Sequence, residues 1–179
     1  MFYTTTHPSP IGQLTLACDG ENLVGLWLKG QKYFGKSVPE ERIEKADIPV
    51  FDAAKNWLTQ YFAGRQPAIS ELPLRPIGSA FRQAVWSILC EIPYGKVVTY
   101  GDIAREMAKK MGRSSMSSQA VGGAVGHNPI SIIIPCHRVV GANGSLTGYA
   151  GGIHNKIKLL ELEGADLSHL FFPKKSTAL

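Results

Sequence analysis

The sequence has few cysteines and no pattern that would join them. Its 179 residues include three, Cys18, Cys90 and Cys136, and no two of them have Cys-x-x-Cys spacing. An odd number without that spacing argues against a disulfide framework and favours a reducing compartment. No group of cysteines and histidines has the spacing of zinc ligands, so we expect no metal and no other cofactor.

Long hydrophobic runs are also missing. No segment approaches the roughly 18 apolar residues that a membrane-spanning helix needs, and the first residues lack the basic and then apolar order of a signal peptide. We therefore expect a cytoplasmic protein with no membrane partner. The apolar content of 44% and the charged content of 18% are typical of a globular protein.

Positive charge is unevenly distributed along the chain. The net charge is +5; residues 1–78 hold 8 basic and 8 acidic side chains, whereas residues 79–179 hold 11 basic and 6 acidic ones. The excess, which includes the pair Lys174-Lys175, therefore lies in the second half. A basic half is typical of nucleic-acid-binding proteins and also of a solvated basic face, so charge alone does not decide between them.

The first half predicts strands followed by a helix. Apolar and polar residues alternate over residues 14–18, the turn signal Asp19-Gly20 follows, and residues 23–28 predict the returning strand. Apolar residues at helical spacing then predict a helix over residues 50–63, with Gly64 as its stop. Prolines in residues 65–78 predict a linker that ends this domain.

The second half predicts mostly helices. The expected helices begin after the capping residue Ser79, at the capping box Thr99–Asp102, at residues 117–125 and at residues 154–163. The middle two suggest a helix-turn-helix. The third carries glycines, and a close approach to DNA explains them about as well as tight helix packing does. Residues 130–134 form an apolar run, which predicts a buried strand that ends near Cys136.

The pair Cys136-His137 is the strongest candidate for chemistry. A thiolate is a good nucleophile, and a neighbouring imidazole can lower the pKa of a thiol. Most free cysteines, however, are plain packing residues, so the pair alone is weak evidence. The residues around it decide its meaning.

Those residues resemble a known family. Asn-Pro at residues 128–129, Ile-Ile-Ile-Pro-Cys-His-Arg-Val-Val-Gly at 132–141, Gly-Tyr-Ala-Gly-Gly at 148–152 and Glu-Gly at 163–164 match the methylated-DNA–protein-cysteine methyltransferases. Members of this family repair 6-O-methylguanine in DNA by direct reversal. The resemblance is strong over residues 79–165 and loose over the first 78.

The resemblance implies an α+β fold in three parts. Residues 1–78 would form a ribonuclease-H-like domain with an antiparallel sheet and a helix. Residues 79–166 would form a mostly helical, winged helix-turn-helix-like domain that holds both the DNA-binding surface and the active site. Residues 167–179 would be a tail, part of which we expect to be disordered.

The resemblance also implies the chemistry. Cys136 would take the alkyl group from 6-O-methylguanine in a single irreversible turnover, because a thioether has no easy leaving reaction; 4-O-methylthymine stays open as a second substrate. Glu163 would orient His137, which would act on the cysteine through a water. Tyr100 would donate a proton to the leaving guanine, and Asn128 would brace the DNA-binding helix against the active-site segment.

The expected partner is double-stranded DNA with alkylated bases, bound by a monomer. The residues implied in binding the DNA and its flipped base are Tyr100, Ser117, Ser118, Gln119, Ala120, Gly122, Arg138, Val139, Tyr149 and Ala150.

Two features depart from the family pattern. Gln119 stands where the family has an arginine that fills the gap left by the flipped base, and glutamine brings hydrogen bonds without charge. The segment between Tyr100 and Gln119 is also longer than in some relatives. It carries Lys109, Lys110 and Arg113, which fit phosphate contacts and a solvated loop equally well.

Two other function classes remain as alternatives. A thiol hydrolase would pair Cys136 with a distant histidine, His127 or His154, and would turn over without DNA. A DNA-binding regulator would use the cysteine to sense oxidants or alkylating agents. Neither explains the joint placement of Tyr100, Asn128, Tyr149 and Glu163.

Overall fold

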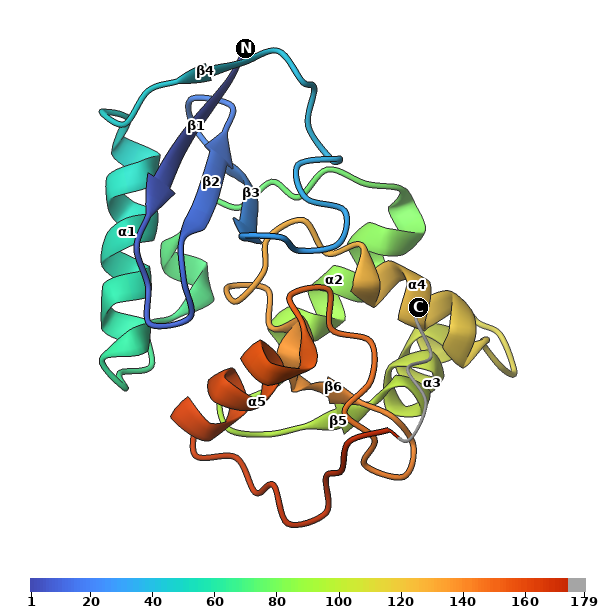
Figure 1. Cartoon of the computed structure of the whole chain (residues 1–179). Helices are drawn as coiled ribbons and strands as arrows, with labels where there is room; N and C mark the ends of the chain where they lie inside the picture. The colour runs from blue at the N-terminus through green and yellow to red at the C-terminus, as the bar shows by residue number, and fades with distance from the viewer. Residues whose placement is uncertain (174–179) are drawn as a thin grey trace. The chain divides into compact units, whose positions relative to one another are not determined.

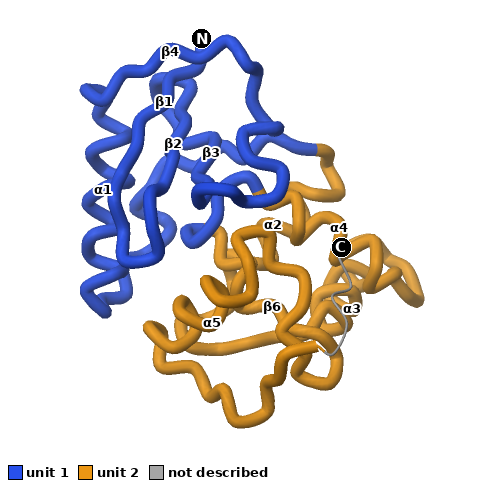
Figure 2. Tube along the Cα trace, viewed as in Figure 1, with its two compact units in different colours: residues 1–78, 129–133 blue, residues 79–128, 134–179 orange. Residues whose placement is uncertain are grey.

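The computed structural model describes residues 1–173, and these form two compact units (Figure 2). Unit 1 contains residues 1–78 and 129–133, and unit 2 contains residues 79–128 and the chain from residue 134 onward. The basic pair Lys174-Lys175 lies outside the described residues. The predicted α+β class is confirmed, with a sheet in unit 1 and mostly helices in unit 2.

Unit 1 is built on a four-stranded sheet. Its strands are β1 (Phe2–His7), β2 (Leu14–Cys18), β3 (Leu23–Leu28) and β4 (Arg42–Glu44), and their order in the sheet is β3-β2-β1-β4. The first three pair antiparallel, whereas β4 pairs parallel to β1. The predicted strands at 14–18 and 23–28 are therefore confirmed, and β1 and β4 were not predicted.

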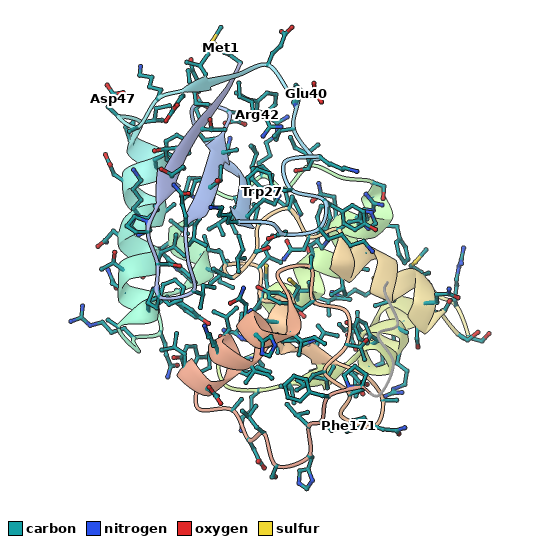
Figure 3. The ribbon with its side chains drawn as sticks, viewed as in Figure 1. Met1, Trp27, Glu40, Arg42, Asp47 and Phe171 are labelled. Atoms are coloured by element: carbon teal, nitrogen blue, oxygen red, sulfur yellow. The ribbon has the colours of Figure 1, made fainter. Side chains whose placement is uncertain are left out.

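Helix α1 (Pro49–Phe62) lies beside this sheet (Figure 1). Pro49 suits its first turn, where a backbone N–H would lack a helical partner, and Gly64 ends it with φ +81°. A short 3-10 helix, η1 (Ile69–Glu71), follows. On β3, the ring of Trp27 (Figure 3) lies so close to Gly25 that a Cβ there would be 2.1 Å from it. Glycine at that position therefore lets the indole pack into the core.

Unit 2 contains four α-helices in its described part. They are α2 (Ala80–Cys90), α3 (Tyr100–Lys110), α4 (Ser118–Gly126) and α5 (Ile153–Leu162). The expected caps are present, because Ser79 accepts from the Arg82 N–H and Thr99 forms a complete capping box with Asp102. Two short strands, β5 (Val98–Thr99) and β6 (Val139–Val140), pair parallel and were not predicted.

The predicted strand over residues 130–134 is wrong. Ile130 alone bridges to Leu26, and the residues after it form a turn in which Ile132 has φ +71°. Residues 128–140 are all buried. An apolar run indicates that a segment is buried. A buried irregular segment has the same pattern as a buried strand, so the run alone does not predict which of the two forms. Cys136 therefore follows a buried turn.

Candidate active site

Cys136 opens a short 3-10 helix, η2 (Cys136–Arg138), which follows the buried turn. The ring of Pro135 fixes the backbone before it, and the Cys136 N–H donates to the carbonyl of Ile134 at 2.8 Å. The Asn128 amide donates to the same carbonyl, also at 2.8 Å. Asn128, which follows the C-cap residue of α4, thereby links the end of that helix to the turn that carries the cysteine.

The thiol of Cys136 is in a dry environment, and the residue is 5% exposed. Burial raises the pKa of Cys136, while a hydrogen bond with Asn128 and the positive charge of Lys156 act in the opposite direction. The imidazole of His137 is not among the groups that shift the pKa of Cys136, and the upward shift favours the protonated thiol.

His137 and Glu163 form a buried pair next to the cysteine. His137 Nε2 lies 2.7 Å from Glu163 Oε1, and neither side chain is exposed to solvent. Hydrogen bonds from His137 and Arg138 lower the pKa of Glu163 to about 2 against the effect of burial. Burial lowers the pKa of His137, although the carboxylate opposes this shift. The pair therefore consists of a carboxylate and a neutral imidazole.

This charge state fixes the tautomer of His137. A carboxylate only accepts hydrogen bonds, so the proton of the imidazole lies on Nε2 and points to Glu163. The other nitrogen, Nδ1, is buried and has no hydrogen-bond partner among the described residues. His137 thus offers a basic lone pair on the side away from Glu163.

Arg138 completes this buried cluster instead of facing outward. Its guanidinium contacts both oxygens of Glu163, at 2.8 to 3.2 Å, and donates to the carbonyl of Ile92 at 2.7 Å. Its side chain is 8% exposed. This differs from the predicted substrate contact by Arg138, because the guanidinium is already occupied by the carboxylate. The arginine instead neutralises a buried charge that would otherwise be costly.

A second buried cation, Lys156 of α5, was missed by the sequence reasoning. Its ammonium donates to the carbonyl of Val139 and, at 3.0 Å, to that of Thr147. Burial lowers the pKa of Lys156 to about 8, and the nearby Cys136 opposes this shift. A signal was present, because Lys156 shares a helix face with the apolar residues Leu159 and Leu160.

Two tyrosines stand close to the same sulfur. The Tyr100 hydroxyl donates to the Thr147 carbonyl at 3.1 Å, and the Tyr149 ring meets the His137 ring edge-on at 6.5 Å between centroids. Burial raises the pKa of both tyrosines, with a smaller contribution from Cys136. Both phenols therefore stay protonated. Val139 is also buried, and Ala150, the residue after Tyr149, is partly exposed.

Helix α4 presents small residues to solvent. Ser117 caps it by accepting from the Ala120 N–H, and the first turn, residues 117–120, is exposed. The sequence predicted a DNA contact by Gly122, but this residue is buried in the structure and does not face solvent. Gly123 and Gly126 face outward, since a Cβ added at either position would meet nothing within 4 Å. On the inner side, the Trp86 indole donates to the Ala124 carbonyl at 2.8 Å and fixes α4 against α2.

Residues 1–173 contain no group of three or more His, Cys, Asp or Glu side chains that could hold a metal ion. In the same part of the chain, no helix is both long and apolar enough to span a bilayer.

Two family models together match nearly the whole chain. Residues 1–76 match the ribonuclease-like domain of 6-O-methylguanine DNA methyltransferase, and residues 80–165 match the DNA-binding domain of the same proteins. The chain belongs to this methyltransferase family. The predicted resemblance and the ribonuclease-like first domain are therefore confirmed.

Individual members of the methyltransferase family are similar over most of their length. The methylated-DNA–protein-cysteine methyltransferase of Haemophilus influenzae is 42% identical over 162 residues, which cover 90% of this chain and 86% of that protein. The Mycobacterium tuberculosis protein is 45% identical over 164 residues, with 91% and 93% covered. A crystal structure of the M. tuberculosis methyltransferase superimposes with a TM-score of 0.77, at 41% identity, over 98% of this chain and 97% of that one.

A further crystal structure shows the M. tuberculosis protein in complex with DNA. It matches this chain with a TM-score of 0.74 and 42% identity, over 90% of this chain and 91% of that one.

Gly95 is another residue that the sequence reasoning missed. It has φ +73°, and its N–H donates to Glu163 Oε2 at 3.2 Å. A Cβ at this position would lie 2.8 Å from the backbone oxygen of Glu163. The turn Pro93-Tyr94-Gly95 after α2 therefore holds the carboxylate of Glu163.

Proposed function

We propose that the protein repairs 6-O-methylguanine in double-stranded DNA by transferring the methyl group to Cys136. The observation that carries this proposal is the enclosed cysteine beside the His137–Glu163 pair, in the unit that matches the family's DNA-binding domain. The sulfur attacks the methyl carbon, the bond between that carbon and O6 breaks, and a carbon–sulfur bond forms. Larger alkyl groups would follow the same course.

The proton of the thiol needs an acceptor. His137 Nδ1 is suited to this task, because Glu163 holds the opposite nitrogen in its protonated form. We propose that a water carries the proton from the sulfur to Nδ1. The buried thiol is neutral at rest, so it becomes a strong nucleophile only when its proton leaves along this route.

The leaving guanine must receive a proton as it departs. Tyr100 is the proposed donor, since its raised pKa keeps the phenol protonated and its position lies within electrostatic range of Cys136. Its hydroxyl would give up the hydrogen bond to the Thr147 carbonyl and donate to the guanine instead. Tyr149, whose hydroxyl is buried without a partner among the described residues, would form a wall of the base pocket together with Val139 and Ala150.

The exposed face of α4 is the proposed surface for the DNA groove. Its residues Ala120 and Gly123 are small, which allows the helix backbone to approach a narrow minor groove. The target base must leave the stack to reach a buried sulfur, at a cost of a few kcal/mol. Gln119, exposed on the first turn, would hydrogen-bond the base whose partner has been flipped out.

The reaction would end after one turnover, because the thioether has no leaving reaction in this site. We also propose that the protein acts as a monomer in the cytoplasm, where its three cysteines would remain reduced.

The deciding experiment uses duplex DNA with a methyl-labelled 6-O-methylguanine. We expect at most one equivalent of label per protein, located on Cys136 by peptide mass spectrometry. A Cys136→Ala variant should bind the same duplex and take up no label. Repeated turnover would support the hydrolase alternative, and sequence-specific binding without transfer would support the regulator; either result overturns the proposal.

A further inference from the structure

A pocket lies between helix α3 and the segment that connects it to α4. Its volume is about 350 Å³. One wall is α3, through Gly101, Ala104 and Ala108, and the opposite wall is the connecting segment. This is the segment that the sequence showed to be longer than in some relatives. The polar residues that line the pocket are Arg105, Lys109, Arg113, Ser114, Ser115 and Ser118.

The charge of this pocket is positive and partly uncompensated. No acidic residue lines it. Arg105 forms an ion pair with Asp102, whereas neither Lys109 nor Arg113 forms an ion pair with any residue in the range 1–173. Both of these side chains are exposed. Two cations are therefore available for an anion that enters from solvent.

Basic and acidic side chains of α3 line two different pockets. A second hollow, of about 210 Å³, is lined by apolar side chains together with Glu91, Asp102 and Glu106. Lys110, next to Lys109 in sequence, lies at 4.0 Å from Glu91. The acidic residues thus line the second pocket, whereas Lys109 and Arg113 line the first. No acidic side chain in the lining of the first pocket neutralises its positive charge.

The pocket also continues the exposed face of α4. Ser118, the first residue of α4, lines the pocket, and the next residue is the exposed Gln119. Figure 1 shows the connecting segment running from the end of α3 to the start of α4. A DNA strand that follows the α4 face would therefore bring its backbone to the mouth of this pocket.

We propose that this pocket binds one phosphate of the DNA backbone, next to the groove that α4 occupies. The inference rests on the proposed function, because it takes α4 as the DNA-facing helix. A guanidinium and an ammonium suit a phosphate, and the three serine hydroxyls are further donors for its oxygens. The pocket supplies, from Lys109 at the end of α3 and Arg113 in the connecting segment, positive charge that Gln119 does not bring to the flipping site.

The first test measures how DNA binding depends on salt. The variant Lys109→Gln/Arg113→Gln removes the two cations that make no ion pair in the described chain, and the control Arg65→Gln/Lys158→Gln removes the same residue types from exposed sites elsewhere. We expect the plot of log K against log salt to become shallower by about 0.9 for each phosphate that the variant no longer neutralises. The control should keep the wild-type slope. Equal slopes in the two double variants overturn the proposal.

The second test locates the phosphate. Single neutral methylphosphonates are placed, one at a time, at each backbone position around the lesion in both strands. At one position the substitution should weaken binding by the wild-type protein and the control, and should have no effect on the Lys109→Gln/Arg113→Gln variant. If every position weakens binding equally in all three proteins, the pocket holds no DNA phosphate.

These results are separable from the proposed function. Methyl uptake by wild-type Cys136 is measured on the same duplexes. If uptake fails, the repair proposal is wrong whatever the salt slopes are. If uptake succeeds and no coupled position is found, only the phosphate pocket is wrong.

Discussion

His137 and Glu163 are joined by a 2.7 Å contact inside unit 2, with both side chains closed off from solvent. They are far apart in sequence, and Glu163 lies directly after α5 as the C-cap residue of that helix. Arg138 and the Gly95 N–H bind the same carboxylate. Glu163 therefore holds Arg138 and Gly95 in place as well as the imidazole of His137.

Glu163→Gln should destabilise the protein by about 3–5 kcal/mol, because the Arg138 charge would stay buried without its partner. The pKa of Glu163 is about 2 in the folded protein and near 4.5 when unfolded, so this stabilisation is complete above pH 4.5 and is lost as the pH falls toward 2. Urea unfolding from pH 6 to pH 3 should show a decline in wild type that is weaker in the variant. Parallel curves would mean that the carboxylate does not titrate as described.

His137→Gln tests the imidazole as a proton acceptor. The amide of the introduced glutamine can still donate to Glu163, but it places no base where Nδ1 now lies. We expect methyl transfer to slow by about 10²–10⁴-fold, the usual contribution of a positioned acid or base, while binding to unmodified duplex persists. Single-turnover rates and DNA affinity are the measurements. Loss of DNA binding together with transfer would indicate a folding role alone.

Local signals were enough to predict most helices. The capping box of Thr99 and Asp102 and the cap at Ser79 involve residues three positions apart, so the sequence reveals them directly. The parallel pair β5–β6 was not predictable in this way. Each strand has two residues, and Val98 pairs with the distant Val139, so tertiary packing determines the pairing.

The site shows the same division. The motif located Cys136, His137 and Glu163, because the resemblance fixed their spacing. It did not reveal the burial of Lys156, since a lysine in a helix is usually a surface residue. Its position depends on the carbonyls of Val139 and Thr147, which come from a different part of the chain.

Lys156→Met tests the electrostatic support of the sulfur. Methionine is an unbranched apolar side chain slightly shorter than lysine, and it removes the charge. The pKa of Cys136 should therefore rise further, because the cation that favours the thiolate is gone. The rate of iodoacetamide alkylation at Cys136, followed against pH, should shift to higher pH. Lys158→Met, at an exposed position of α5, is the matched control and should leave the profile in place.

The burial of Lys156 should also affect how the free energy of unfolding depends on pH. Its pKa is about 8 when folded and 10.5 when unfolded, so between these values the unfolded chain binds more protons. Stability from this group therefore rises as the pH increases from 8 to 10.5. The Lys156→Met variant should lack that rise in urea unfolding, whereas Lys158→Met should retain it.

Variants at Gly123 test whether the glycine of α4 serves helix packing or the approach of the helix to the DNA groove. A Cβ at this position meets open space, and alanine is favoured over glycine in a helix by about 1 kcal/mol, so Gly123→Ala should raise the unfolding free energy by up to that amount. DNA affinity should fall, because the added methyl group holds the α4 backbone away from the groove. Gly123→Leu should lower the affinity further at similar stability. If both variants lose stability and bind DNA as wild type does, α4 uses its glycine for packing and the groove face lies elsewhere.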